Sequence, residues 1–311
     1  MKKNLLKHFL FHIMLPILFL VQSSTVSAIV MRHDVDRELY LLDLYNYPSA
    51  IRSDLCSATL ITPRWALTAA HCVDPELGWS VAKFGKLVIL DQQISIKAIY
   101  SHPAYSTSIH DIALVELHEP IYTIEPTPLY EGSDELGQTL KLAGFGGLGN
   151  AVDGLDVSTG WSLLHGADNV TSLANDYHLG FKFDNPADGT SLPLEGVGGP
   201  GDSGGPAYIE TSEGRFIAGV SSFGDQFYGG SDYYTRVSQE LDWIKEVMKV
   251  EYPGYYAGPL YSEVEHNDKA PDYANNEDRE GSSGGSSKPS YLLLLASILF
   301  ARKSKVLMRN R

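Results

Sequence analysis

The stretch that decides the fold is Gly201-Asp202-Ser203-Gly204-Gly205-Pro206. Its glycines flank Ser203 without side chains, so another backbone can approach the serine hydroxyl closely. A serine hydroxyl is a weak nucleophile at its ordinary pKa and needs a base within hydrogen-bond reach and a third group to orient that base. Alone, the stretch is equally compatible with a turn, because Gly, Asp and Ser all favour turns. It predicts a catalytic serine only if the other groups are present.

Two segments earlier in the chain contain those groups. Ala69-Ala70-His71-Cys72 offers a histidine as the base, and His110-Asp111-Ile112-Ala113-Leu114 offers a carboxylate beside an apolar run that we expect to be buried. Taken singly, His71 also fits a partly buried structural histidine and Asp111 a charge at a strand edge. Together with Ser203 they provide the nucleophile, base and orienting acid of a triad.

The hydrophobic pattern between residues 29 and 252 predicts an all-β domain. Short apolar runs such as Leu87–Leu90 and Phe216–Val220 recur between Gly, Pro, Asn and Asp, which is typical of sandwiches and barrels. From residue 237 to about 250 the apolar residues instead fall at helical intervals. One amphipathic α-helix is therefore expected to close the domain.

These motifs resemble the chymotrypsin/trypsin family of serine endopeptidases, in the family's order His, Asp, Ser. The resemblance covers residues 29–252. Further matching segments are His102–Tyr105, Ala143–Gly146, Ser222–Gly224 and Tyr234–Val237. The resemblance implies two six-stranded antiparallel β-barrels with the site in the cleft between them. Barrel one is expected at about 29–135, barrel two at about 136–236 and the C-terminal helix at about 237–250.

The same resemblance assigns roles to single residues. Ser203 attacks the scissile carbonyl, His71 transfers the proton and Asp111 orients the histidine, while the backbone N–H groups of Gly201 and Ser203 form the oxyanion hole. The implied function is hydrolysis of peptide bonds in proteins through an acyl-enzyme, with no cofactor and no metal. A catalytically inert homologue that binds peptides at the cell surface is the alternative. An α/β-hydrolase esterase is disfavoured, because its serine precedes its histidine in the chain.

Primary specificity is less well defined by the sequence. Val197 occupies the pocket-floor position that is aspartate in trypsin-like enzymes, whereas Asp232 matches the opposite pocket wall. Asp232 either pairs with an Arg or Lys of the substrate in a desolvated pocket or faces solvent in a rearranged loop. Ser222 and Gly224 are expected to pair with the substrate backbone, beside Phe223 at a position usually held by Trp.

The resemblance also implies a disulfide and an activation step. Cys56 and Cys72, the two cysteines of the chain, match the family's bridge beside the catalytic histidine. In the family, a freed Ile-Val amine pairs with the aspartate before the serine. Ile29 and Asp202 match this pair here, although the residues after Ile29-Val30 depart from the family's Gly-Gly.

The two ends indicate export. Residues 1–28 have a basic start, a short apolar core and small residues before Ala28, typical of a signal peptide that signal peptidase removes to leave Ile29 first. Residues 253–290 are an acidic Gly/Ser-rich segment expected to be a disordered spacer, and 291–311 are a short apolar segment with a basic tail, too short for a comfortable membrane span. This order resembles the bacterial GlyGly-CTERM sorting signal, which implies a bacterial secreted or surface protein, a rhomboid-like sorting protease and a secretion system, with transient or marginal membrane contact. An ordinary weak tail anchor is the alternative.

Composition excludes some other functions. Across 311 residues, 38 Asp and Glu oppose 24 Lys and Arg, for a formal net charge of -14. Nucleic acid is therefore not an expected partner, because phosphate binding relies on clustered Lys and Arg. The cysteines and histidines do not have the spacing of a structural zinc site.

Overall fold

The computed structural model describes residues 29–74, 87–156 and 162–249. These residues belong to one compact unit. The predicted signal peptide, the acidic spacer and the apolar segment at 291–311 lie outside the described residues. Within the described part of the chain, no helix is long and apolar enough to cross a membrane.

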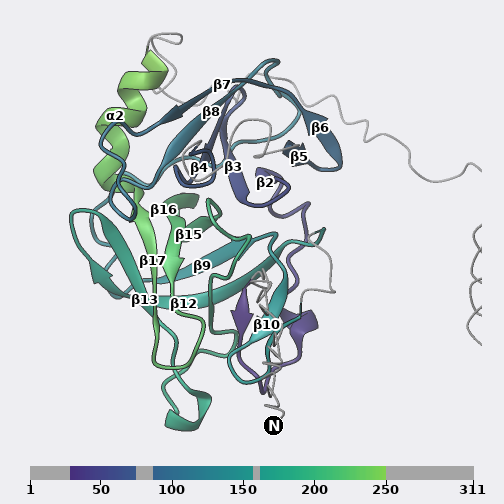
Figure 1. The fold of residues 1–311 in the computed structure, drawn as a ribbon, viewed down its shortest axis with the longest axis vertical. Coiled ribbons are helices and arrows are strands. Elements are labelled where there is room, and N and C mark those ends of the chain that lie inside the picture. Colours follow the sequence, from purple (N-terminus) through teal and green to yellow (C-terminus); the bar gives the residue numbers. More distant parts are fainter. Residues whose placement is uncertain (1–28, 75–86, 157–161, 250–311) are drawn as a thin grey trace, which may run out of the picture. The chain divides into compact units, whose positions relative to one another are not determined.

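The N-terminal half is a curled antiparallel sheet of seven strands in the order β6-β5-β2-β3-β4-β8-β7 (Figure 1). Three neighbouring strands, β3, β4 and β8, are buried along their whole length, which explains their nearly continuous apolar sequences. The strands are β2 (Ala50–Arg52), β3 (Ser57–Thr62), β4 (Trp65–Thr68), β5 (Leu87–Ile89), β6 (Gln92–Ile94), β7 (Ile96–Ser101) and β8 (Ala113–Leu117).

The C-terminal half is a closed barrel of six strands in the order β12-β13-β17-β16-β15-β9. It lies below the seven-stranded sheet in Figure 1. The strands are β9 (Thr139–Gly144), β12 (His165–Ala174), β13 (His178–Lys182), β15 (Pro206–Thr211), β16 (Gly214–Gly224) and β17 (Ser231–Arg236). A closed barrel leaves no sheet edge exposed.

A small third sheet, β11-β10-β1-β14, lies beside this barrel. It contains β1 (Val30–Met31), β10 (Leu148–Asn150), β11 (Gly154–Asp156) and β14 (Gly196–Val197). The described residues also form two short 3-10 helices, η1 (Arg37–Tyr40) and η2 (Pro186–Asp188). Val30 pairs with Gly149 on one side and Val197 on the other. Val30 and Met31, expected in barrel one, thus pair with strands of the second half.

The helix α2 (Val237–Lys249) returns to the N-terminal half, where Val237, Ile244 and Met248 are buried in the same apolar cluster as residues of β3, β4 and β8. The mostly β architecture with two β-units and one C-terminal helix confirms the expected chymotrypsin-like fold class. It also confirms the periodicity that predicted the helix.

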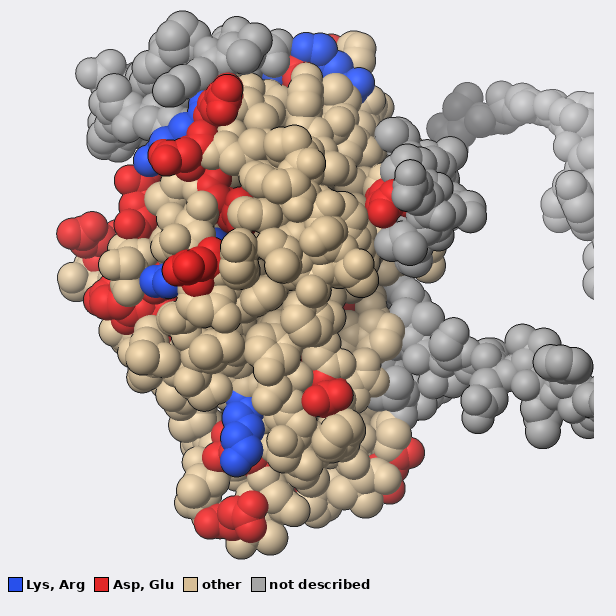
Figure 2. All heavy atoms as spheres, turned by 60° about the vertical axis from the view of Figure 1, so that its left-hand side comes forward, with Lys and Arg blue, Asp and Glu red and all other residues tan. Residues whose placement is uncertain are grey.

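Charge is unevenly distributed on the surface. On the face shown in Figure 2, acidic side chains predominate over basic ones and gather toward one edge, beside a broad area without charge. This face therefore shows the acidic character of the sequence.

Candidate active site

His71 and Asp111 meet because the strands before and after them are neighbours. Thr68 at the end of β4 lies opposite Ala113 at the start of β8, so the two segments leave the sheet at the same edge. The backbone N–H of His71 donates to Asp111 Oδ1 at 2.8 Å, and His71 Nδ1 lies 2.7 Å from Asp111 Oδ2. Asp111 thus contacts both the backbone and the ring of the histidine.

The C-terminal barrel also binds Asp111. Ser222 Oγ on β16 donates to Asp111 Oδ2 at 2.5 Å, and Thr235 Oγ1 on β17 donates to the Asp111 carbonyl at 2.9 Å. Burial acts to raise the pKa of Asp111, which is 1% exposed, but the hydrogen bonds and charge of His71 and the bond from Ser222 together lower it below its ordinary value. Asp111 is therefore ionised and fixed from both halves of the molecule.

The loop with Ser203 is bound to the N-terminal sheet through Ser57 at the start of β3. Ser57 N–H donates to the Ser203 carbonyl at 2.8 Å, and Ser57 Oγ donates to the Gly201 carbonyl at 3.0 Å. Gly204 has a φ of +79°, and a Cβ there would lie 2.1 Å from Thr68 Oγ1. Glycine is required at this position, because only glycine allows both that backbone conformation and that close approach.

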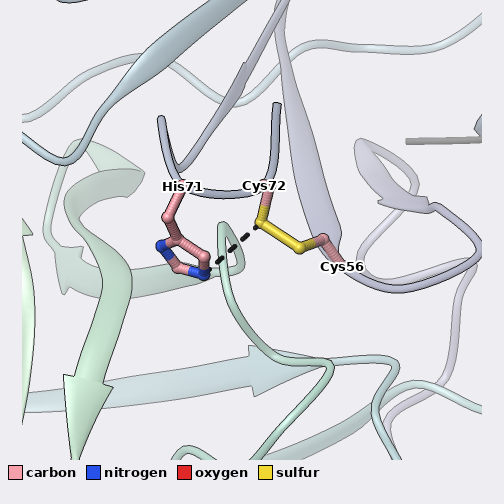
Figure 3. A group of neighbouring side chains, drawn as sticks. All are labelled: Cys56, His71 and Cys72. Atoms are coloured by element: carbon pink, nitrogen blue, oxygen red, sulfur yellow. Dashed lines mark hydrogen bonds between the residues drawn. A yellow bond between two sulfur atoms is a disulfide. The ribbon is translucent and has the colours of Figure 1, made fainter. Parts of the chain in front are cut away.

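Ser203 and His71 are thus brought to the same edge of the sheet. Within the described residues, the recorded contact of His71 Nε2 is Cys72 Sγ at 3.8 Å (Figure 3), and no hydrogen bond joins His71 to Ser203 Oγ. A hydrogen bond between a base and its nucleophile is often long before substrate binds and tightens in the complex. In the same part of the chain, the backbone N–H groups of Gly201 and Ser203 donate to no protein acceptor, as an oxyanion hole requires.

The expected disulfide is present. Cys56 and Cys72 form a bond of 2.03 Å with their Cα atoms 6.3 Å apart, and Figure 3 shows it beside the ring of His71. These two cysteines and His71 lie close enough together to resemble a metal site, but disulfide sulfurs are not thiolate ligands. The bridge instead fixes the turn that presents His71.

A cavity of about 290 Å³ opens beside Ser203. Asp232 lies in its wall, 2% exposed, and accepts hydrogen bonds from Gly198 N–H at 2.6 Å and Tyr233 N–H at 3.1 Å. Burial raises the pKa of Asp232 to about 8. The cavity is lined by Gly198, Gly199, Pro200, Ser203, Ser221, Ser222, Phe223, Gly224, Gln226 and Asp232.

This cavity bears on two of the sequence-based expectations. Asp232 lines it rather than facing solvent, and Ser222, Phe223 and Gly224 line it too. Val197, expected at the pocket floor, is not among the lining residues: it is fully buried in an apolar cluster with Val30 and Phe183. The reason is that β14, which contains Val197, pairs with β1.

Asp202 is a second buried acid close to the site. It is fully buried, and its two carboxylate oxygens accept from Gly146 N–H at 3.2 Å and Gly199 N–H at 3.0 Å. Burial raises the pKa of Asp202 to about 7, and no cation within the described residues pairs with it. Ile29, its expected partner, is also fully buried.

A group that the sequence did not single out lies beyond Asp111. Glu240 on α2 is 1% exposed and contacts two histidines, His102 and His110. A signal was present, since Glu240 lies three residues after Val237 and four before Ile244, on the apolar face of the helix. A carboxylate at that position indicates a buried partner.

Comparison with known proteins agrees with this geometry. Residues 44–244 match the trypsin family, and the chain belongs to this family of serine peptidases. It is 32% identical over 228 residues to Trypsin Tyr p 3.0101 of Tyrophagus putrescentiae (62% of this chain, 72% of the relative). It is 30% identical to an uncharacterized peptidase of Corynebacterium glutamicum (68% of each chain) and 29% identical to phenoloxidase-activating factor 3 of Holotrichia diomphalia (65% of this chain). It spans 66% of the length of that last relative.

Proposed function

We propose that this protein is a secreted serine endopeptidase that cleaves proteins with the triad Ser203, His71 and Asp111. The observation that supports it best is the double contact of Asp111 with the backbone and ring of His71. Accepting from Nδ1–H fixes the tautomer, so the lone pair on Nε2 is free to act as a base toward the serine.

In the acylation step, Ser203 Oγ bonds to the scissile carbonyl carbon and its proton passes to His71 Nε2. The carbonyl π electrons move to the oxygen, which the N–H groups of Gly201 and Ser203 stabilise, each donor being worth about 3 kcal/mol. When the intermediate collapses, the C–N bond breaks and His71 gives its proton to the leaving amine. Asp111 stays ionised throughout and stabilises the imidazolium.

Deacylation repeats these steps with water as the nucleophile. His71 takes a proton from water as the new C–O bond forms on the acyl carbon, and it returns that proton to Ser203 Oγ when the ester bond breaks. The products are a carboxylic acid and the free serine. Every proton is transferred by this chain's own groups, so the reaction needs no cofactor.

The primary specificity we propose is for Arg and Lys. Asp232 lies buried in the cavity beside Ser203, where no cation from the described residues pairs with it, and a buried carboxylate is stabilised by a counter-charge. A substrate guanidinium or ammonium entering the cavity provides one. The acidic surface additionally attracts basic substrates at low ionic strength.

We further propose that removal of residues 1–28 by signal peptidase activates the enzyme directly. The new α-amine of Ile29 provides the ammonium that the buried Asp202 lacks. A separate propeptide is then unnecessary. Export by this route, followed by sorting through a rhomboid-like protease and a secretion system at the 291–311 segment, places the enzyme outside the cell, with transient membrane contact.

The test is the variant Ser203→Ala. We expect peptidase activity to vanish while the thermal unfolding curve is unchanged, with Ser212→Ala, a serine outside the site, as the matched control. Activity that persists in Ser203→Ala contradicts the proposal. A wild-type protein that binds peptides in the cavity but cleaves none supports the inert homologue instead.

A further inference from the structure

Glu240 connects the C-terminal helix to two histidines near the triad. Its Oε1 lies 2.8 Å from His110 Nδ1, and its Oε2 lies 3.5 Å from His102 Nε2. The two imidazole rings stack with centroids 4.3 Å apart and planes 15° apart. Trp243 contacts His102 and Tyr177 contacts His110, both edge to face, so the group is enclosed by aromatic rings.

Two histidines and a carboxylate also form a set of ligands suitable for a metal, and their ligand atoms lie within 4.8 Å of one another. The hydrogen bonding disfavours this function. His102 Nδ1 accepts from Ala104 N–H at 3.2 Å, so in neutral His102 the proton is on Nε2, the nitrogen facing Glu240. A metal-bound histidine instead donates from its other nitrogen. The group therefore fits a carboxylate that accepts from the imidazole N–H of His110 and lies beside the imidazole of His102.

The position of His110 links this group to catalysis. His110 directly precedes Asp111 and has a φ of +54°, a left-handed conformation that is uncommon for a residue other than glycine and must be maintained by its surroundings. The carbonyl of His110 accepts from Ile112 N–H at 2.8 Å, across Asp111. The hydrogen bond between His110 and Glu240 holds the side chain of this turn, and on its other side Thr235 Oγ1 donates to the Asp111 carbonyl at 2.9 Å.

We infer that Glu240 is a positioning residue for the triad: by binding His110 it maintains the left-handed turn that presents the Asp111 carboxylate to His71. Glu240 touches no substrate and acts only through His110. Its burial makes the contact specific, because a carboxylate that is 1% exposed must keep its hydrogen-bond donors. This inference rests on the proposed function of His71, Asp111 and Ser203.

The decisive variant is Glu240→Leu, which has similar volume and accepts no hydrogen bond. Rates are taken per active site, counted by burst titration with an acylating substrate, so unfolded protein does not contribute. We expect kcat to fall about tenfold or more, since misplacement of a catalytic group by about 1 Å has effects of this size, and KM to stay within about twofold. We also expect the acid limb of the kcat/KM profile, which reports His71, to move to lower pH, because a displaced Asp111 stabilises the imidazolium less.

Three further variants make the test specific. Glu240→Gln, whose amide oxygen still accepts from His110, should recover part of kcat. His110→Ala, which loses the bond to Glu240 and disfavours positive φ, should reproduce the Glu240→Leu result even if that variant folds poorly. Glu119→Leu is the matched control, because Glu119 contacts His118 at 3.1 Å in an exposed pair, and it should leave every parameter unchanged.

The inference is overturned if Glu240→Leu keeps the wild-type kcat and acid limb per titrated site. It is also overturned if kcat falls with an unchanged acid limb, or falls equally in Glu119→Leu, because the role is then merely structural. Failure of the proposed function is distinguishable, since it appears as activity in Ser203→Ala. An inactive Ser203→Ala with a fully active Glu240→Leu refutes this inference alone.

Discussion

Two regions of the site contain buried acids whose pKa values shift in opposite directions. Asp111 lies where the two halves meet and accepts from His71 and Ser222, so its pKa is lowered despite burial. Asp202 and Asp232 lie within the C-terminal half and accept only from backbone N–H groups, and burial raises their pKa values to about 7 and about 8. Similar burial thus produces opposite shifts.

The difference shows what each region is prepared to do. A carboxylate with a complete set of partners stays ionised and fixed, as required of the acid that orients His71. A buried carboxylate without a cation is stabilised when one arrives. We interpret Asp232 as the acceptor of a substrate cation and Asp202 as the acceptor of the Ile29 amine.

The largest effect is expected for Asp111→Asn, which removes the ionised carboxylate from the first of these two regions. Its amide cannot accept from both His71 and Ser222 in the same manner, so the histidine adopts the wrong tautomer, and kcat is expected to fall by about 10⁴-fold, the effect characteristic of this class of triad. Burst-titrated kinetics on a fluorogenic peptide measure it. A loss below about tenfold would mean that the fixed carboxylate does not orient the base.

Asp232→Asn should abolish the preference for basic substrates. We expect kcat/KM for an Arg substrate to fall about 100-fold, because the substrate charge loses its buried partner, while a Phe substrate changes little. In the wild type the preference for Arg over Phe should grow as the pH rises through about 8, since Asp232 then ionises.

The control for that substitution is Asp225→Asn, which changes a neighbouring acid that is not among the cavity-lining residues. It should retain the Arg preference. A wild-type enzyme that prefers Phe, with this preference unchanged in Asp232→Ser, excludes the acidic pocket.

Extending the chain by two residues before Ile29 tests Asp202. A blocked amine leaves that carboxylate without its cation, so kcat/KM should fall about tenfold or more relative to protein that starts at Ile29, as the competent loop conformation becomes less populated. Intact mass verifies each terminus. In an Asp202→Asn background the same extension should have no effect. An equal fall in kcat/KM there would mean that the amine does not act through Asp202.

The smallest effect concerns stability. Because the pKa of folded Asp232 is raised above its ordinary value of 3.8 to about 8, the folded state binds more protons than the unfolded state between those values. The unfolding free energy then decreases as pH rises through this window. The Tm of Asp232→Asn relative to wild type should therefore increase from pH 5 to pH 9, by about 5 °C or more. A Tm difference that stays constant with pH would mean that another group compensates the charge of Asp232 in the folded state.

Sequence was sufficient for the parts of the site that lie in short motifs. The segments around His71, Asp111 and Ser203 predicted residues that the fold brings to one sheet edge, and Cys56 and Cys72 are bridged as expected. The β-rich class and the closing helix followed from apolar periodicity. Each of these depends on a local pattern or on a motif that resembles a known family.

Contacts between segments far apart in the chain were not predictable in this way. Val197 was expected at the pocket floor, but pairing of β14 with β1 buries it elsewhere. Glu240 meets His110 across 130 positions of sequence, and the positive φ of His110 has no signature in a single sequence. The Glu240 contact and this backbone conformation both depend on how α2 packs against the N-terminal half.

The most direct measurement of the central claim is labelling with an organophosphonate serine reagent, followed by peptide mass spectrometry. The account predicts one adduct per chain, on Ser203, formed at a rate that drops sharply in His71→Ala and in Asp111→Asn while Ser222 and Ser221 stay unmodified. Absence of an adduct in folded protein that starts at Ile29, or labelling at the same rate in His71→Ala, would contradict it.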